Sequence, residues 1–172
     1  MQLAKILGAE QVIATASTQE KLDLARSLGA DTGVNYTDPD WPQQVKRASG
    51  GTGVDIVLDA VGGDIFRRSF ECLAPFGHVI NYGNASGESS IVDMWQLTVP
   101  NQSESGFYLG AYLGRPQLLQ EAYGVLFSNA ASGTLKVHAE EVFPLEQAAE
   151  AHRRIESRQT TGKVFLQPRR AR

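Results

Sequence analysis

A short pattern, Leu-Gly-Ala followed by an acid, occurs twice in this chain and constrains its fold more than any other feature. The copies lie in KILGAEQVIAT, from residue 5, and in RSLGADTGVNY, from residue 26. In each copy the glycine, Gly8 or Gly29, can adopt the positive φ that ends a helix, and the alanine lets the helix pack closely on the following strand. The pattern therefore predicts two successive helix-to-strand connections, which are typical of layered α/β folds.

The rest of the chain continues this alternation. Strands are predicted at residues 12–16, 33–36, 54–58, 78–83 and 106–112, with helices between the first four. A long helix is predicted from residue 116 to about 131, with these residues buried: Leu119, Ala122, Tyr123, Leu126 and Phe127. Strands separated by helices imply a mostly parallel sheet covered on both faces, so the predicted fold class is α/β, Rossmann-type and doubly wound.

The two ends of the chain depart from this pattern. The helix over residues 1–8 has no strand before it, so we expect the doubly wound sheet to lack its first strand. Residues 136–172 are predicted to form a helix followed by a lone strand, with no helix to return it to the sheet. We therefore expect an incomplete NAD(P)-binding Rossmann domain over residues 1–135 and a C-terminal helix-strand appendage over 136–172.

Composition argues against several classes of function. A net charge of −3 disfavours a general nucleic-acid or anionic-membrane binder. Cys72 is the only cysteine and the three histidines are scattered, so no metal site and no catalytic triad are predicted. No apolar run approaches membrane-spanning length and no secretory signal is present, so the expected location is cytoplasmic.

The carboxyl ends of the predicted strands are where an open α/β sheet binds ligands. Gly62, Gly63 and Gly83 lie in turns at two of these ends, where small residues leave room for a flat dinucleotide. The alternative is that these glycines only permit tight turns. The fingerprint G-x-G-x-x-G is absent, and Asp59, at a strand end, is a weak candidate to meet a ligand.

The end of the first strand discriminates between nicotinamide cofactors. A domain selective for NAD places an acid there to bind the ribose hydroxyls, whereas residues 15–18 read Thr-Ala-Ser-Thr. The hydroxyls of Ser17 and Thr18, with the ammonium of Lys21, favour the 2′-phosphate of NADP(H). The alternative is that Ser17 only caps a helix, in a capping box with Glu20, and that Lys21 is a solvated charge.

These segments resemble medium-chain dehydrogenase/reductases of the quinone-oxidoreductase-like branch without zinc. The resemblance rests on QLAKILGAEQVIATASTQEKLDLARSLGAD, VNY, GVDIVLDAVGG, LAPFGHVINYGNASG and TTGKVFL, and it covers nearly the whole chain. It implies a Rossmann domain that interrupts a GroES-like catalytic domain. It also implies reduction of quinones, enones or related carbonyl compounds by hydride transfer from NADPH.

Carried over position by position, the resemblance implies a cofactor site at the ends of the predicted strands. Its residues are Ser17 and Lys21 at the 2′-phosphate with Tyr36 beside them, Val61 and Gly62 at the adenosine, Gly83 and Asn84 at the nicotinamide ribose, Phe107 to Leu109 at the carboxamide, and Lys163 near the phosphates. The family also implies a homodimer through the strand around residues 106–112.

In the family's strand order, the missing strand lies between the strands at 12–16 and 56–58. These two strands must then close together, recruit another segment or face water with unpaired backbone groups.

Two functional hypotheses follow. The first is the cofactor-binding portion of an NADPH-dependent oxidoreductase whose small-molecule substrate is bound largely by other parts of the intact enzyme, so that the 172-residue chain alone is inactive. The second is a non-catalytic nucleotide-binding or oligomerising module. A methyltransferase with a similar sheet is a more distant alternative, because it too favours an acid at the end of the second strand, which this chain lacks.

Overall fold

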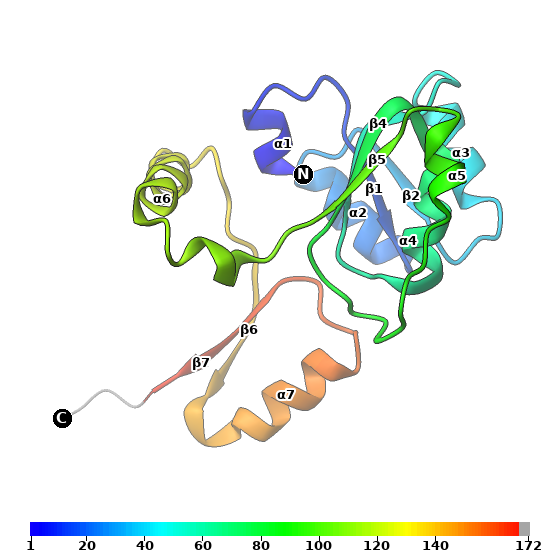
Figure 1. Ribbon diagram of the computed structural model, residues 1–172. Helices are drawn as coiled ribbons and strands as arrows, with labels where there is room; N and C mark the ends of the chain where they lie inside the picture. The colour runs from blue at the N-terminus through cyan, green and yellow to red at the C-terminus, as the bar shows by residue number, and fades with distance from the viewer. Residues whose placement is uncertain (169–172) are drawn as a thin grey trace. The chain divides into compact units, whose positions relative to one another are not determined.

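The computed structural model describes residues 1–168, apart from the side chain of Glu140. Helices and strands alternate through most of the chain (Figure 1), which confirms the predicted α/β class. Two compact units are present, Met1–Ala122 and a second from Tyr123 onward. The domain boundary expected after residue 135 stays a prediction.

The elements of the first unit are α1 (Gln2–Ile6), β1 (Ile13–Ala16), α2 (Gln19–Ser27), β2 (Thr32–Asn35), α3 (Trp41–Ala48), β3 (Val54–Asp59), α4 (Gly63–Ser69), η1 (Phe70–Cys72), β4 (Leu73–Asn81), α5 (Met94–Thr98), β5 (Ser103–Gly106) and η2 (Leu109–Tyr112). Helix α6 (Pro116–Ala131) crosses into the second unit. The second unit continues with β6 (Ala139–Pro144), η3 (Leu145–Gln147), α7 (Ala148–Glu156) and β7 (Lys163–Gln167).

The strands of the first unit form two parallel sheets rather than one. Strand β1 pairs with β2, and β3, β4 and β5 form a separate sheet in that order. Within the described residues, β1 therefore does not pair with β3, and no other segment pairs with both of them. Ile56 and Leu58 of β3 remain 62% and 63% exposed. Of the three outcomes expected around a missing strand, the structure shows open edges.

The two Leu-Gly-Ala-acid copies fold alike and are joined by an ion pair. Gly8 and Gly29, with φ of 93° and 100°, follow α1 and α2 as predicted, and the next alanine N–H bonds to a carbonyl five residues earlier. Asp31, the acid of the second copy, accepts a hydrogen bond from the Val12 N–H at 2.7 Å and pairs with Lys5 Nζ at 2.7 Å. Asp31 of the second copy thus fixes the backbone just before β1, the strand that follows the first copy.

A shared core connects the two sheets. Val34, Trp41, Val45 and Cys72 form one buried cluster from β2, α3 and η1, and Ile13 of β1 and Val54 of β3 pack against it. A second buried cluster lies between α4, α5 and the larger sheet, and comprises Phe66, Phe70, Leu73, Val79 and Leu97. The sheets are therefore connected through apolar packing around α3, and burial of this kind stabilises by about 25 cal/mol per Å².

The predicted strand at 106–112 is wrong. The last strand of the larger sheet is Ser103–Gly106, and Leu109–Tyr112 form a 3-10 turn. The aromatic run is typical of a strand, but here the chain curls so that the Phe107 and Tyr112 rings lie 5.2 Å apart. Leu113 N–H bonds to the carbonyl of Gly110, which closes the turn.

The second unit corrects two further predictions. Strand β7 is not alone, because β6 pairs with it in parallel and α7 packs against both. In α6 no side chain is buried. Leu119 and Leu126 are half-buried, and Tyr123 and Phe127 are 47% and 70% exposed. The apolar pattern identifies which side of a helix is hydrophobic, but does not establish that another element covers it.

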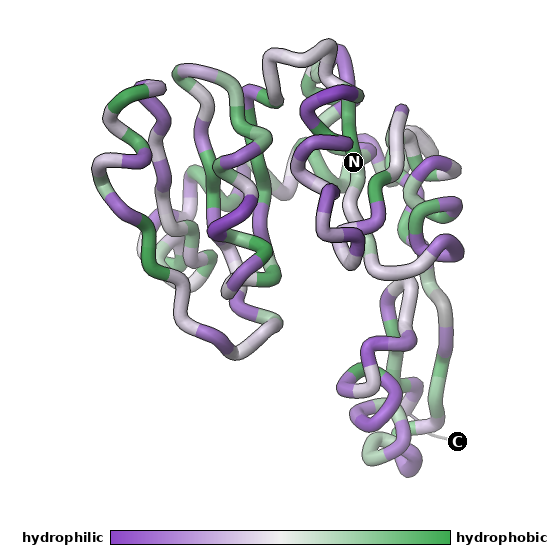
Figure 2. The backbone as a smooth tube through the Cα atoms, turned by 90° about the vertical axis from the view of Figure 1, so that its right-hand side faces the viewer, coloured by the Kyte–Doolittle hydropathy of each residue, from purple (hydrophilic) through white to green (hydrophobic). Residues whose placement is uncertain are grey.

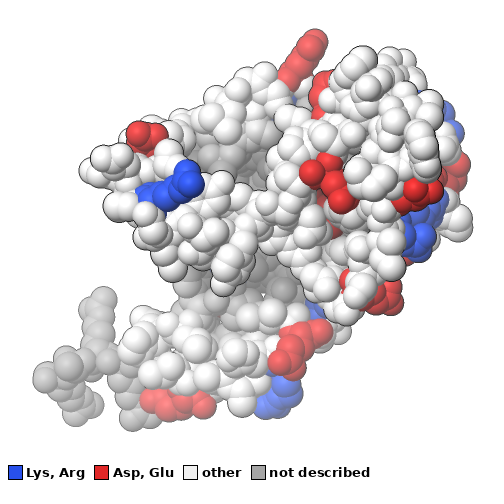
Figure 3. Space-filling model, in the orientation of Figure 1, with Lys and Arg blue, Asp and Glu red and all other residues white. Residues whose placement is uncertain are grey.

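Hydrophobic and hydrophilic residues alternate along the backbone in Figure 2. No helix in residues 1–168 has the length and apolar character needed to cross a membrane. Acidic and basic side chains are interspersed on the face shown in Figure 3.

Candidate functional site

The turn that follows β3 is organised by the last residue of that strand. Asp59 is only 4% exposed, and its carboxylate accepts hydrogen bonds from the N–H of Val61 at 3.3 Å and of Gly62 at 2.9 Å. Gly62 precedes α4 with φ 75° and ψ −165°, a region that is essentially restricted to glycine. The strand end therefore folds into a tight turn in which Gly62 contributes backbone but no side chain.

The turn that follows β4 interlocks with this first turn. N–H groups of Tyr82, Ala85 and Ser86 donate to the carbonyls of Asp59, Ala60 and Val61, respectively, at 2.8 to 3.0 Å. A Cβ at Gly83 would lie 3.0 Å from the carbonyl oxygen of Ala60, and one at Gly62 would lie 2.4 Å from Asn84 Oδ1. Glycine is favoured at position 62 by its backbone conformation and at position 83 by the close approach of the Ala60 backbone.

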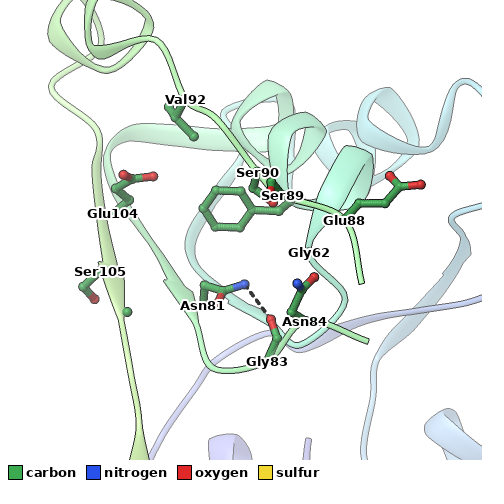
Figure 4. A pocket seen from close by; sticks show the side chains of 12 residues that line it. Gly62, Asn81, Gly83, Asn84, Glu88, Ser89, Ser90, Val92, Glu104 and Ser105 are labelled. Carbon is green, nitrogen blue, oxygen red and sulfur yellow. Dashed lines mark hydrogen bonds between the residues drawn. The ribbon is translucent and has the colours of Figure 1, made fainter. Parts of the chain in front are cut away.

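Both glycine turns border a pocket of about 450 Å³. Figure 4 shows Asn81, Gly83 and Asn84 at one side of this pocket and Glu104 and Ser105 of β5 at another. The loop after the second turn contributes Glu88, Ser89 and Ser90, and Ser90 Oγ accepts a hydrogen bond from Gly63 N–H at 2.8 Å. The lining is thus mainly polar, with Phe66 and Val92 as its apolar part.

The residues predicted at a 2′-phosphate lie at the carboxyl ends of β1 and β2. Tyr36 follows β2, and its N–H donates to the carbonyl of Ala16 at 3.1 Å. Thr18, not Ser17, is the N-cap of α2, and its hydroxyl accepts from the Lys21 N–H at 3.3 Å. The interpretation of Ser17 as the cap is therefore wrong. The helix begins one residue later than predicted, and Ser17 Oγ forms no hydrogen bond within residues 1–168.

The remaining predicted site residues fall in two places. Phe107 N–H donates to the carbonyl of Asn81 at 2.7 Å, so Phe107 lies beside the turn after β4, and Leu109 begins η2. Gly62, Gly83 and Asn84 border the pocket, whereas Val61, Phe107 and Leu109 do not. Lys163 begins β7 in the second unit, and its N–H bonds to the carbonyl of His138. Roles for all of these residues at a cofactor stay predictions.

Two polar side chains, those of Asp59 and Asn81, hold the two turns by hydrogen bonds that the sequence analysis did not predict. Asp59 was a candidate to meet a ligand, and the structure turns its carboxylate into the backbone instead. Asn81 was not singled out, yet its Nδ2 donates to Asp59 Oδ2 at 2.8 Å and to the Gly83 carbonyl at 3.0 Å. Asn81 meets Asp59 only through the pairing of β3 with β4, so the order of residues contains no signal that could have identified it.

The described part of the chain does not fit a bound metal ion. No group of three or more histidine, cysteine, aspartate or glutamate side chains comes together within residues 1–168. Cys72 is buried in the apolar cluster around Trp41, and burial raises its pKa to about 11. A thiol with that pKa is a poor metal ligand or nucleophile at neutral pH.

Comparison with known proteins shows that this chain is similar to dehydrogenases and reductases. A sequence model described as zinc-binding dehydrogenase matches residues 1–126. The 2-haloacrylate reductase of a Burkholderia species is 34% identical over 96% of this chain and 50% of its own length. A structure of Escherichia coli quinone oxidoreductase complexed with NADPH is 36% identical, with a TM-score of 0.88 over 97% of this chain and 52% of the other.

A crystal structure described as an NAD-dependent alcohol dehydrogenase is 37% identical, with a TM-score of 0.85 over 96% of this chain and 46% of the other. The chain thus spans about half the length of the relatives it matches. Both nicotinamide cofactors are named among these similar structures.

Proposed function

This chain belongs to the zinc-binding dehydrogenase family of medium-chain dehydrogenase/reductases, and on that premise we propose that it forms the cofactor-binding part of an NADPH-dependent oxidoreductase. The observation that carries the proposal is the pair of interlocked glycine turns at the ends of β3 and β4. A dinucleotide needs backbone free of side chains at the carboxyl edge of a parallel sheet. The similarity to the E. coli enzyme, whose structure contains NADPH, supports the same assignment.

The end of β1 supports NADPH rather than NADH. No acid occurs in residues 15–18, whereas a carboxylate there would repel a 2′-phosphate. We assign the 2′-phosphate to Ser17, Thr18 and Lys21. The Ser17 hydroxyl is not used by the helix cap, so it is available as a donor to a phosphate oxygen.

The reaction we propose is reduction of a quinone, an enone or a related electron-poor compound. When bound, NADPH supplies a hydride from C4 of its nicotinamide, and a proton completes reduction of the acceptor. The residues of this chain bind and orient: Gly83 and Asn84 at the nicotinamide ribose, and the backbone from Phe107 to Leu109 at the carboxamide. Positioning of this kind lowers the barrier without a catalytic side chain, and none is assigned here.

The decisive measurement is titration of the 172-residue chain with NADPH and with NADH, followed by nicotinamide fluorescence. We expect NADPH to bind more tightly. Ser17→Asp should weaken NADPH binding about tenfold without weakening NADH binding, because the new carboxylate opposes only the 2′-phosphate. Thr52→Asp, which places the same charge in the exposed turn before β3, is the control. Binding of NADH as tight as that of NADPH would contradict the assignment.

We further propose that the intact protein is a cytoplasmic homodimer. Support for the dimer comes from β5, an edge strand of its sheet whose residues are all exposed. Tyr108 and Leu113, next in the chain, are 77% and 73% exposed. A reduced compartment suits a chain whose only cysteine is buried.

The same exposed edge favours the second candidate, a non-catalytic nucleotide-binding or oligomerising module. Turnover in the intact protein separates the two, since only the oxidoreductase reduces a quinone at the expense of NADPH. For the 172-residue chain alone we expect NADPH binding without quinone reduction.

A further inference from the structure

Asp59 is buried at the end of β3, yet it is not paired with a cation. No ion pair joins Asp59 to lysine, arginine or histidine in the described part of the chain, 1–168. Its carboxylate is satisfied by three N–H donors: the backbone of Val61, the backbone of Gly62 and the side-chain amide of Asn81. Hydrogen bonds to an ionised acceptor are the stronger kind, so a buried carboxylate with three donors fixes the groups around it.

Asn81 extends this arrangement to the second turn. It is the register partner of Asp59 across β3 and β4, so both residues stand at the same level of the sheet. Its amide group uses both of its N–H bonds, one to Asp59 Oδ2 at 2.8 Å and one to the Gly83 carbonyl at 3.0 Å. Figure 4 shows the second of these bonds across the turn.

We propose that Asp59 and Asn81 are positioning residues that hold the two glycine turns in the spacing a dinucleotide requires. The proposal rests on the proposed function, because it concerns the same site. Neither residue is assigned a contact with the cofactor. Asp59 fixes the turn at Val61 and Gly62, on the adenosine side, and Asn81 transmits that position to Gly83, on the nicotinamide side.

The chemistry requires an acid at position 59. An asparagine there has one acceptor oxygen for two backbone donors, and its own N–H₂ group would face the N–H₂ group of Asn81. Asp59→Asn therefore loses the bond to Asn81 or one to the turn. Asn81→Ala instead keeps the hydrogen bonds that the Val61 and Gly62 N–H groups donate to Asp59. It removes the donor to Asp59 Oδ2 and the donor to the Gly83 carbonyl, so the second turn loses its link to the first strand end.

The two substitutions predict different binding patterns, which a general loss of stability would not produce. The probes are NADPH and 2′,5′-ADP, which carries only the adenosine half of NADPH. Asp59→Asn should weaken both ligands by about tenfold or more, the equivalent of one hydrogen bond to a charged group. Asn81→Ala should weaken NADPH by a similar factor and leave 2′,5′-ADP unchanged. Asp55→Asn, an exposed acid on the same strand, is the matched control and should alter neither affinity.

Amide hydrogen exchange tests the link independently of ligand binding. In Asp59→Asn, the Gly62 amide should exchange at least about tenfold faster than in the parent chain, while the amide of Val79, in the core, is unaffected. Unchanged affinities in Asp59→Asn, or equal weakening of both ligands in both variants, would overturn the proposal. If the parent chain binds neither ligand, the proposed function fails, and an unchanged Gly62 exchange rate in Asp59→Asn then refutes the link itself.

Discussion

One methyl group at Gly62 tests the description of the interlocked turns. The backbone there, with φ 75° and ψ −165°, costs a residue other than glycine ~1–3 kcal/mol. A Cβ would also lie 2.4 Å from Asn84 Oδ1 and 3.4 Å from Ser86 Oγ. Asn84 is exposed and its side chain can rotate away, whereas the backbone strain remains. We therefore expect Gly62→Ala to lower the free energy of unfolding by ~1–3 kcal/mol.

Urea unfolding, followed by far-ultraviolet circular dichroism and by tryptophan fluorescence, measures this loss. Gly87→Ala is the matched control, because Gly87 has the same φ of 75° and nothing lies within 4 Å of its Cβ position. The difference between the two variants measures what the ψ of −165° and the neighbouring side chains at Gly62 together add to a positive φ. Combining Gly62→Ala with Asn84→Ala should recover only the part due to the Asn84 contact.

Two results would refute this reasoning. If Gly62→Ala unfolds at the same urea concentration as the parent, the turn is not held in the glycine-only region. If Gly87→Ala loses as much as Gly62→Ala, neither the ψ of Gly62 nor the approach of Asn84 and Ser86 adds to the cost of a positive φ.

Three further predictions concern other parts of the molecule. The ion pair with Lys5 lowers the pKa of Asp31 below 3.8, so its contribution to stability is present above that pH and is lost as the pH falls through the folded-state value. Lys5→Met should therefore flatten the acid side of a thermal-unfolding profile, and an unaltered profile would argue against the pair. Burial raises the pKa of Cys72 to about 11, so a thiol reagent at pH 8 should label it only in urea, and fast labelling of the native chain would contradict this. Tyr108→Lys, in the exposed segment after β5, should shift sedimentation of the intact protein from dimer to monomer, whereas an unchanged dimer would place the interface elsewhere.

The order of the elements was predictable because it depends on local chemistry. Gly8 and Gly29 end their helices as expected, at the two Leu-Gly-Ala-acid copies. These features depend on a few neighbouring residues, so the sequence pattern contains enough information. The same holds for the glycine turns at the ends of β3 and β4.

Features that depend on distant partners were not predictable. The aromatic residues at 107–112 are typical of a strand, but pairing with β4 ends just before them, at Gly106, and the chain turns back on itself. The partner of β7 was missed because AEEVFP lacks the clear alternation of a strand. At the site, the use of Asn81 depends on its register with Asp59, which the order of residues along the chain does not contain.

The open edge of β3 has a consequence for handling the protein. An unpaired strand edge with exposed isoleucine and leucine is a template on which another chain can add a strand. Such addition depends on how often two molecules meet, whereas the packing around α3 holds each molecule together at any dilution. Self-association should therefore increase with protein concentration well before heating disrupts the core, and concentration is the variable to control first.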